Sequence, residues 1–214
     1  MTHPLDDEIF PYTPADVGVP FVLQAGSCTD SLFESPFYPT QGEPPKLDMA
    51  GELRGLYGAP GALTWKPEWS AYRGKRPRPE PHWGVDIYGP AGEPVVAVVD
   101  GELSFLQDLP GLGLYALLRF TRQGKQYVFH YGHLKAASGA ARSVTKGERV
   151  GFIGCSGNAN NTGICSVNAP GQAISSSHLH LALVAPPDPN RPKRADPLGV
   201  LGWKLHSPAK PGWL

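Results

Sequence analysis

Short runs of apolar residues, in which hydrophobic and polar positions often alternate, fill the chain after residue 82. They are rich in β-branched, aromatic and aliphatic residues and read VDIY, PVVAVVDGELSFLQ, LYALLRF, KQYVFHYGHL, RVGFIG and HLHLALVA. Turn-forming segments such as GPAGE, DLPGLG, RQG and KGE separate these runs. The pattern predicts a mainly β fold built on an antiparallel sheet, and no amphipathic helix of three turns is expected in this part.

The run HLHLALVA combines this alternation with two histidines. Alternate side chains of a strand share a face, so His178 and His180 are expected to point the same way. Leu179, Leu181 and Leu183 would point to the opposite face and anchor the strand in a core. Two histidines placed in this way can serve one metal ion as a ligand and as a neighbouring base. The alternative is a polar strand face with two solvated histidines.

Residues 1–69 have a different texture, rich in proline, glycine and aromatic residues. In this irregular extension we expect at most short strands or turns, with one short helix around residues 46–56 as an option. Residues 70–81, SAYRGKRPRPEP, predict an extended basic linker because of their closely spaced prolines. The chain therefore divides into an N-terminal extension (1–69), a linker (70–81), a β domain (82–202) and a C-terminal tail (203–214).

The composition narrows the class of protein. Glycine and proline contribute 26 and 24 of the 214 residues, yet 41% of the residues are hydrophobic. A folded core with many turns therefore fits better than disorder, and a helical bundle is disfavoured. No run of 18 apolar residues occurs, so no membrane-spanning helix is expected. The first residues lack a basic region followed by an apolar one, so no secretory signal is visible.

The charges balance overall but not along the chain. Lys+Arg and Asp+Glu number 19 each, which leaves no net charge for binding nucleic acid. Residues 1–69 hold 10 acidic and 3 basic side chains, whereas residues 70–214 hold 9 acidic and 16 basic ones. We favour two differently charged surfaces as the explanation. The alternatives are that the acidic segment packs on the basic domain, or that the basic domain faces a polyanionic substrate.

The three cysteines are Cys28, Cys155 and Cys165, and none forms a CxxC motif. A cysteine-based zinc finger is therefore not expected. Cys155 and Cys165 bracket a loop, and their spacing is compatible with a disulfide, which would imply an oxidising compartment. Two buried free thiols are an equally compatible alternative.

The histidines suggest a metal site in the β domain. Four of the seven lie with Asp86 in the segments HWGVD, YGHL and HLH. Imidazole nitrogen and carboxylate oxygen are ligands of catalytic zinc, which takes three protein ligands and keeps one open position. We expect His82 in a turn and Asp86 early in the next strand, both directed at one point, although HxxxD also occurs by chance.

The remaining histidines are expected to differ in role. His133 follows Tyr131 and Gly132 at a predicted strand end, where it could contact water at the metal. His130 has the opposite strand parity and is expected to be structural. His3 and His206 lie in terminal segments and are expected to have no special role.

Several motifs, in order along residues 80–202, resemble those of the lysostaphin-type zinc metallopeptidases. The matching segments are His82-Trp83-Gly84-Val85-Asp86, Gly92 to Gly101, Tyr131-Gly132-His133-Leu134, Gly147 to Gly157, Thr162-Gly163, His178-Leu179-His180 and Asp196-Pro197-Leu198. The resemblance implies a twisted antiparallel β-sheet with a metal ion in a groove. It implies His82, Asp86 and His180 as Zn²⁺ ligands, and His133 and His178 as the catalytic pair beside the ion.

The chain departs from the family between Thr162-Gly163 and His178, where the family usually has about one residue. Residues 164–177, ICSVNAPGQAISSS, fill this gap. A bridge between Cys155 and Cys165 would tether the start of this insertion beside the expected site. The insertion could narrow the groove or set the choice of substrate, so the family's substrate preferences do not transfer directly.

The resemblance implies a zinc-dependent endopeptidase that cuts peptide cross-links or stems of peptidoglycan, in the periplasm or the extracellular cell wall. The expected chemistry is attack by an activated water, with His133 and His178 as general base and oxyanion-stabilising group in roles that stay unassigned. The competing hypothesis is a non-catalytic relative that binds cell wall or activates other hydrolases. A further hypothesis is an injected antibacterial toxin paired with an immunity protein. We expect a monomer.

Overall fold

The computed structural model describes residues 22–25, 39–40, 82–89, 91–160, 165, 177–188, 191–195, 197–201 and 203–206. These residues form two antiparallel sheets, which confirms the prediction of a mainly β, antiparallel fold. The short helix considered around residues 46–56, most of the N-terminal extension and the linker lie outside the described residues.

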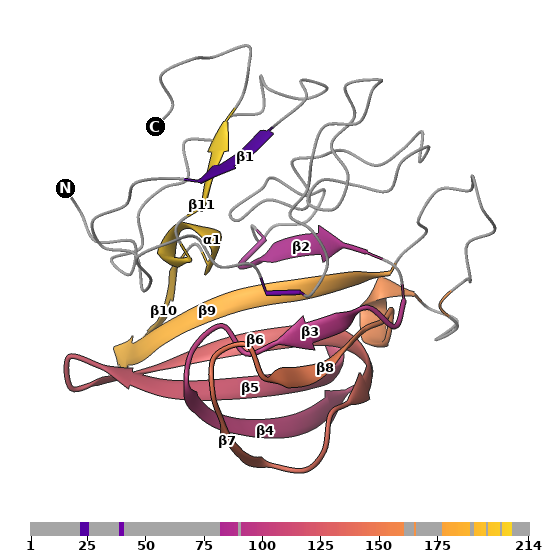
Figure 1. Cartoon of the computed structure of the whole chain (residues 1–214), viewed down its shortest axis with the longest axis horizontal. Coiled ribbons are helices and arrows are strands. Elements are labelled where there is room, and N and C mark those ends of the chain that lie inside the picture. Colours follow the sequence, from indigo (N-terminus) through magenta and orange to yellow (C-terminus); the bar gives the residue numbers. More distant parts are fainter. Residues whose placement is uncertain are drawn as a thin grey trace.

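The larger sheet has nine strands and holds the four longest ones side by side (Figure 1). Its main path runs β10-β9-β6-β5-β4-β7, with β2 paired to β9, and β8 paired to both β6 and β3. The strands are β2 (Val85–Tyr88), β3 (Pro94–Val96), β4 (Gly101–Asp108), β5 (Gly113–Arg122), β6 (Lys125–Ala137), β7 (Arg142–Val144), β8 (Arg149–Ile153), β9 (His178–Asp188) and β10 (Arg191–Ala195).

Only short helices accompany the strands in the described part of the chain. They are the 3-10 helix η3 (Gly157–Ala159) and α1 (Pro197–Val200). None of the described helices has the length and apolar character needed to cross a membrane. The expectation of no three-turn helix after residue 82 therefore holds for the described residues.

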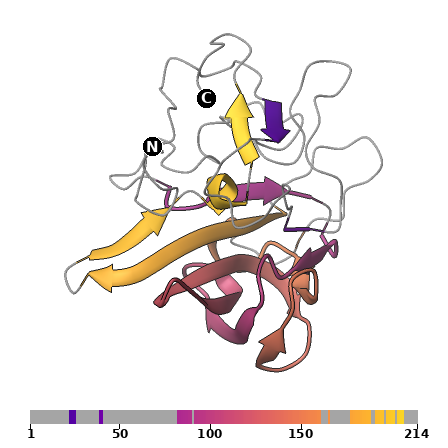
Figure 2. The same cartoon turned by 60° about the vertical axis from the view of Figure 1, so that its left-hand side comes forward.

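One face of the large sheet forms the core. Leu179, Leu181 and Leu183 of β9 are fully buried and belong to the main hydrophobic cluster, as the alternation predicted. Phe129 and Tyr131 of the neighbouring β6 are also fully buried. The sheet bends strongly, so that β3 and β8 cross over it (Figures 1 and 2). Strand β9, which carries His178 and His180, is therefore anchored in the core by its three leucines.

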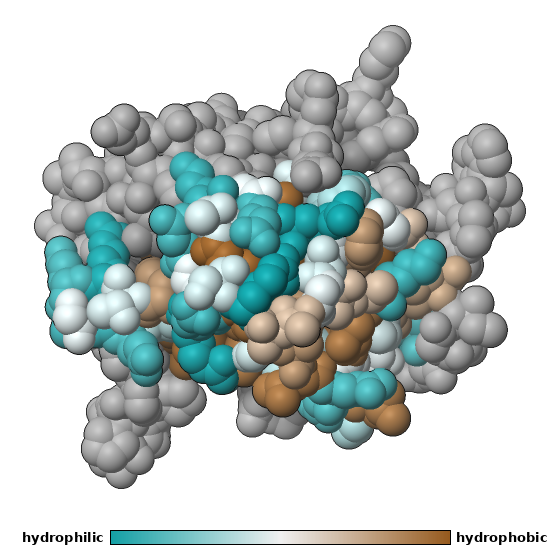
Figure 3. Space-filling view, turned by 60° about the horizontal axis from the view of Figure 1, so that its bottom comes forward, coloured by the Kyte–Doolittle hydropathy of each residue, from teal (hydrophilic) through white to brown (hydrophobic). Residues whose placement is uncertain are grey.

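The outer surface near β4 and β7 is mixed in character. Figure 3 brings this side forward and shows hydrophilic and hydrophobic residues interspersed. Leu106 and Leu109, at the β4–β5 turn, are the exposed large hydrophobic residues of the described part. Among the described residues, this side therefore presents no continuous hydrophobic patch.

The smaller sheet joins one strand from the N-terminal extension to one strand from the C-terminal tail. Strand β1 (Val22–Ala25) pairs with β11 (Trp203–His206), and both lie beyond β2 and α1, away from β4 and β7 (Figures 1 and 2). A second contact joins residues 39–40 to the large sheet, where the Val96 amide donates to the Pro39 carbonyl at 2.9 Å and Thr40 bridges Val95. Part of the expected C-terminal tail is thus a strand.

Candidate metal centre

Strand pairing brings three predicted metal ligands together. His82 lies just before β2, Asp86 is the second residue of β2, and His180 is the third residue of β9. Asp86 and His180 are direct partners in the β2–β9 ladder. Asp86 lies early in a strand as expected, whereas His82, which was expected in a turn, lies in a segment without regular structure just before that strand.

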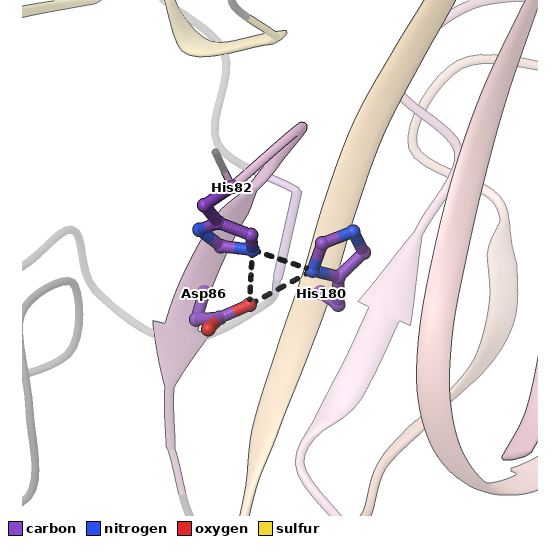
Figure 4. A group of neighbouring side chains, drawn as sticks. All are labelled: His82, Asp86 and His180. Atoms are coloured by element: carbon purple, nitrogen blue, oxygen red, sulfur yellow. Dashed lines mark hydrogen bonds and ion pairs between the residues drawn. The ribbon is translucent and has the colours of Figure 1, made fainter. Parts of the chain in front are cut away.

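The ligand atoms of these three residues form a compact triangle (Figure 4). Nε2 of His82 lies 3.0 Å from Nδ1 of His180 and 3.2 Å from Oδ1 of Asp86, and the last two atoms are 2.9 Å apart. Atoms bound tetrahedrally to zinc at about 2.0–2.1 Å lie roughly 3.3 Å from one another. The triangle is therefore within a few tenths of an ångström of the separation that a zinc ion requires.

Gly84 makes room for this arrangement. A Cβ atom at Gly84 would lie 2.7 Å from Nε2 and Cε1 of His180 and 2.6 Å from the Leu181 carbonyl oxygen. The imidazole of His180 therefore packs directly against the Gly84 backbone. The structure therefore gives Gly84 a steric role in the site.

The site is buried and its carboxylate is held ionised. His82 and Asp86 are 4% and 2% exposed. Burial alone would raise the pKa of Asp86, but the charges of His82 and His178 and hydrogen bonds from His180 and His82 outweigh it. The net effect holds the pKa of this carboxyl well below its usual range. A buried anion among imidazoles is the donor set that a divalent cation prefers.

The two histidines expected to act beside the metal lie against the triangle. Nε2 of His178 is 3.7 Å from Oδ1 of Asp86. The His133 ring meets the His178 ring edge-on at 4.7 Å between centroids and the His180 ring at 5.9 Å. All five predicted site residues are therefore in one cluster.

His133 reaches the site through a bulge in β6. Leu114 and Ala116 of β5 pair with Leu134 and Tyr131 of β6, so two steps on β5 oppose three on β6. His133 adopts a positive φ of 60° at this point. Regular alternation would turn it toward the core with Tyr131, and the bulge turns it toward the metal site instead. The predicted strand end at His133 was wrong, because β6 continues to Ala137.

The parity argument for His130 was also wrong. His130 pairs with Ala182, and Gly132 pairs with His180, so His130 shares the face of His180. It lies next to the site, stacked on Tyr115 at 6.4 Å between ring centroids. Burial, then the charges of Arg194, His180 and Arg119, lower its pKa to about 4.

The hydrogen bonds of His133 define its tautomer. Its Nδ1 lies 2.8 Å from the Ser156 carbonyl oxygen, which only accepts, so Nδ1 carries a proton and donates it. Burial, followed by the charges of His178 and His180, lowers the pKa of His133 to about 3. The ring is therefore neutral at neutral pH, with its lone pair on Nε2. Composition and spacing did not reveal Ser156, because a backbone carbonyl leaves no residue-type signal.

A disulfide joins Cys155 to Cys165, which resolves the alternatives of bridge and free thiols. Cys155 is fully buried directly after β8. Thr162, Gly163 and most of the 164–177 insertion lie outside the described residues, as does His3, while His206 lies in β11.

The sequence was compared with known proteins. The model of peptidase family M23 matches residues 80–189. The DD-carboxypeptidase/endopeptidase Mpg of Neisseria meningitidis serogroup B is 37% identical over 76 residues, covering 36% of this chain and 17% of that protein. An uncharacterized metalloprotease of Haemophilus influenzae is 38% identical over 89 residues, covering 41% of this chain and 17% of that protein. The matches thus span under a fifth of the length of these relatives.

The structure was also compared with solved structures. The catalytic domain of a mutant of the prophage-encoded M23 protein EnpA from Enterococcus faecalis gives a TM-score of 0.45 at 21% identity, covering 75% of this chain and 95% of that chain. The catalytic domain of the antimicrobial peptidase lysostaphin from Staphylococcus simulans gives 0.44 at 20% identity, covering 69% and 88%.

Proposed function

This chain belongs to peptidase family M23, and we propose that it is a zinc-dependent endopeptidase acting on the peptide cross-links or stems of bacterial peptidoglycan. The observation that carries the proposal is the buried triangle of His82, Asp86 and His180, with two more histidines against it. A structural role alone would not require five ionisable groups, four of them buried, to lie together.

The donor set fits zinc. Two imidazole nitrogens and one carboxylate oxygen from His82, His180 and Asp86 would hold the ion, and three protein ligands leave a position open for reaction. A bound zinc ion supplies Lewis-acid polarisation of the scissile carbonyl and acidifies a water molecule. No glutamate of the HExxH type is present in the sequence, so histidine must handle the proton.

The two remaining histidines differ in a way that suggests separate roles. His133 donates its Nδ1–H to the Ser156 carbonyl, so the lone pair on Nε2 can accept the proton of the attacking water and return it to the leaving amine. His178 faces the Asp86 carboxylate, with Nε2 3.7 Å from Oδ1, and an N–H of its ring can donate a hydrogen bond at this place. We therefore assign His133 as the general base and His178 as the donor to the developing oxyanion.

Peptidoglycan is the proposed substrate because of the family and its relatives. One of these relatives, Mpg, carries the name DD-carboxypeptidase/endopeptidase. We place the activity in the periplasm or extracellular cell wall. All five site residues come from one chain, so a monomer suffices. The hypothesis of an injected toxin with an immunity protein stays a prediction from the sequence.

The test combines metal analysis with hydrolysis of purified peptidoglycan. We expect the His82→Ala and Asp86→Ala variants to lose zinc and activity together. We expect His133→Ala and His178→Ala to retain zinc while hydrolysis falls at least about 100-fold. A chelator should abolish the activity of the natural chain and added zinc should restore it.

The outcomes separate the competing functions. Zinc retained in full by His82→Ala contradicts the ligand set. A zinc-loaded natural chain that releases no fragments from any peptidoglycan supports the non-catalytic alternative. Mass spectrometry of fragments from two peptidoglycan chemotypes would identify the scissile bond.

A further inference from the structure

The segment Gly154–Ser156, between β8 and η3, contacts both histidines of the proposed catalytic pair, His133 and His178. The Gly154 carbonyl accepts a hydrogen bond from the His178 amide at 3.0 Å. The Ser156 carbonyl accepts one from Nδ1 of His133 at 2.8 Å. The His178 amide on β9 and the His133 side chain on β6 are thus both hydrogen-bonded to this three-residue segment.

The side chain of Ser156 ties this piece to both strands around the bulge. Its hydroxyl donates to the Leu134 carbonyl at 2.8 Å and accepts from the Leu114 amide at 3.0 Å. Leu134 directly follows His133, and Leu114 pairs with it across the β5–β6 ladder. The hydroxyl therefore satisfies two backbone groups that the bulge takes out of the regular ladder.

Close backbone packing leaves Ser156 little freedom to move. A Cβ atom at Gly113 would lie 2.3 Å from the Ser156 Oγ, and one at Gly157 would lie 2.3 Å from the Gly111 carbonyl oxygen. Both glycines have a φ of 68°, which disfavours other residues. On the opposite side, a Cβ atom at Gly154 would lie 2.3 Å from the Lys135 amide nitrogen.

We propose that Ser156 is a positioning residue for His133, whose hydroxyl holds the Ser156 carbonyl where it selects the Nδ1–H tautomer and leaves the Nε2 lone pair for proton transfer. Without this acceptor both neutral tautomers of imidazole are open to the ring. The consequence for the rate rests on the proposed function, whereas the tautomer is a property of the folded chain alone.

The test follows the His133 ring by ¹⁵N NMR of histidine-labelled, zinc-loaded protein, with resonances assigned by His133→Gln. The natural chain should show the Nδ1–H tautomer. Ser156→Ala should show a mixture of tautomers, a kcat lower by about 10–100-fold, and unchanged KM and zinc content. Ser156→Thr keeps the hydroxyl in an extended backbone, φ −65° and ψ 161°, and should restore both readouts.

Ser143→Ala is the matched control, because Ser143 donates to Glu102 on the exposed part of the same sheet. It should leave the tautomer and kcat unchanged. The proposal is overturned if the natural chain shows the Nε2–H tautomer, or if Ser156→Ala keeps the Nδ1–H tautomer and full kcat. An Nδ1–H tautomer that Ser156→Ala loses, in a protein without peptidase activity, would uphold the positioning role and refute the proposed function instead.

Discussion

Gly84 shows how a residue without a side chain can determine a metal site. The His180 ring occupies the space that a Cβ at Gly84 would need. In Gly84→Ala, the methyl group would push the ring or the β9 backbone away from Asp86. We expect zinc affinity to fall by about 10–100-fold, as measured by competition with a chromophoric chelator.

Gly111→Ala is a suitable control for this variant, because its Cβ would meet only the carboxylate of Asp108, at the end of a flexible exposed side chain. It should retain the zinc affinity of the natural chain. If the two variants bind zinc with equal affinity, the structure accommodates a methyl group at Gly84, and the Gly84–His180 contact does not determine zinc binding.

His130 predicts how stability changes in acid. Its pKa is about 4 in the folded chain, whereas an unfolded histidine titrates near 6.5. Between these values the unfolded chain binds more protons, so the free energy of unfolding decreases as pH falls from about 6.5 toward 4. His130→Gln removes this contribution. Urea denaturation should show the natural chain losing about 2 kcal/mol more than the variant between pH 7.5 and 4.5.

Loss of metal in acid affects both chains alike, so the comparison isolates His130. If the free energy of unfolding changes with pH by the same amount in both chains, His130 takes up its proton at the same pH in the folded and the unfolded chain. That result would contradict its partly buried position.

At the scale of elements, the sequence predicted the features that depend on the alternation of residues within one strand. It missed the features that depend on how neighbouring strands pair. The leucine face of β9 and the position of Asp86 in β2 follow from the strand period of two. The bulge at His133 does not, because it arises from unequal pairing of β5 with β6. The sequence therefore placed His133 at the site through a strand end that the structure does not have and through the resemblance, and it gave a wrong reason for setting His130 apart.

The disulfide after β8 secures the same region as Ser156. It closes a short loop, with a sequence separation of 10 between Cys155 and Cys165. Replacing both by alanine should lower the free energy of unfolding by about 2–3 kcal/mol, measured by thermal or urea denaturation. The hydrolysis rate should also fall while zinc is retained, because Cys155 lies between the residues that hold His178 and His133.

Cys28→Ala controls for the loss of a cysteine as such, and should leave stability and rate unchanged. If the double variant matches it in both measurements, the bridge contributes nothing to the alignment of the histidines.

At the scale of the whole molecule, every residue of the candidate site lies between residues 82 and 180. The described contact of the N-terminal extension with the large sheet is at β3, through Pro39 and Thr40. Strand β3 pairs with β8, whereas the metal ligands lie on or beside β2 and β9. From the change in residue composition, the sequence predicted a boundary near residue 82. It did not predict this contact, because a bridge between segments distant in the chain leaves no local sequence pattern.

This separation between contact and site predicts the effect of removing residues 1–75. The shortened chain should keep its zinc and hydrolyse peptidoglycan within about twofold of the full chain, because the described contact lies away from the ligands. Its Tm should fall by at least about 2–4 °C, because the Val96 amide loses the Pro39 carbonyl, a hydrogen bond of about 1 kcal/mol, and β11 loses its partner strand β1. A shorter deletion of residues 1–30 keeps Pro39 and should preserve that contact. A strong rise in activity on removing residues 1–75 would instead identify the extension as a segment that blocks the groove.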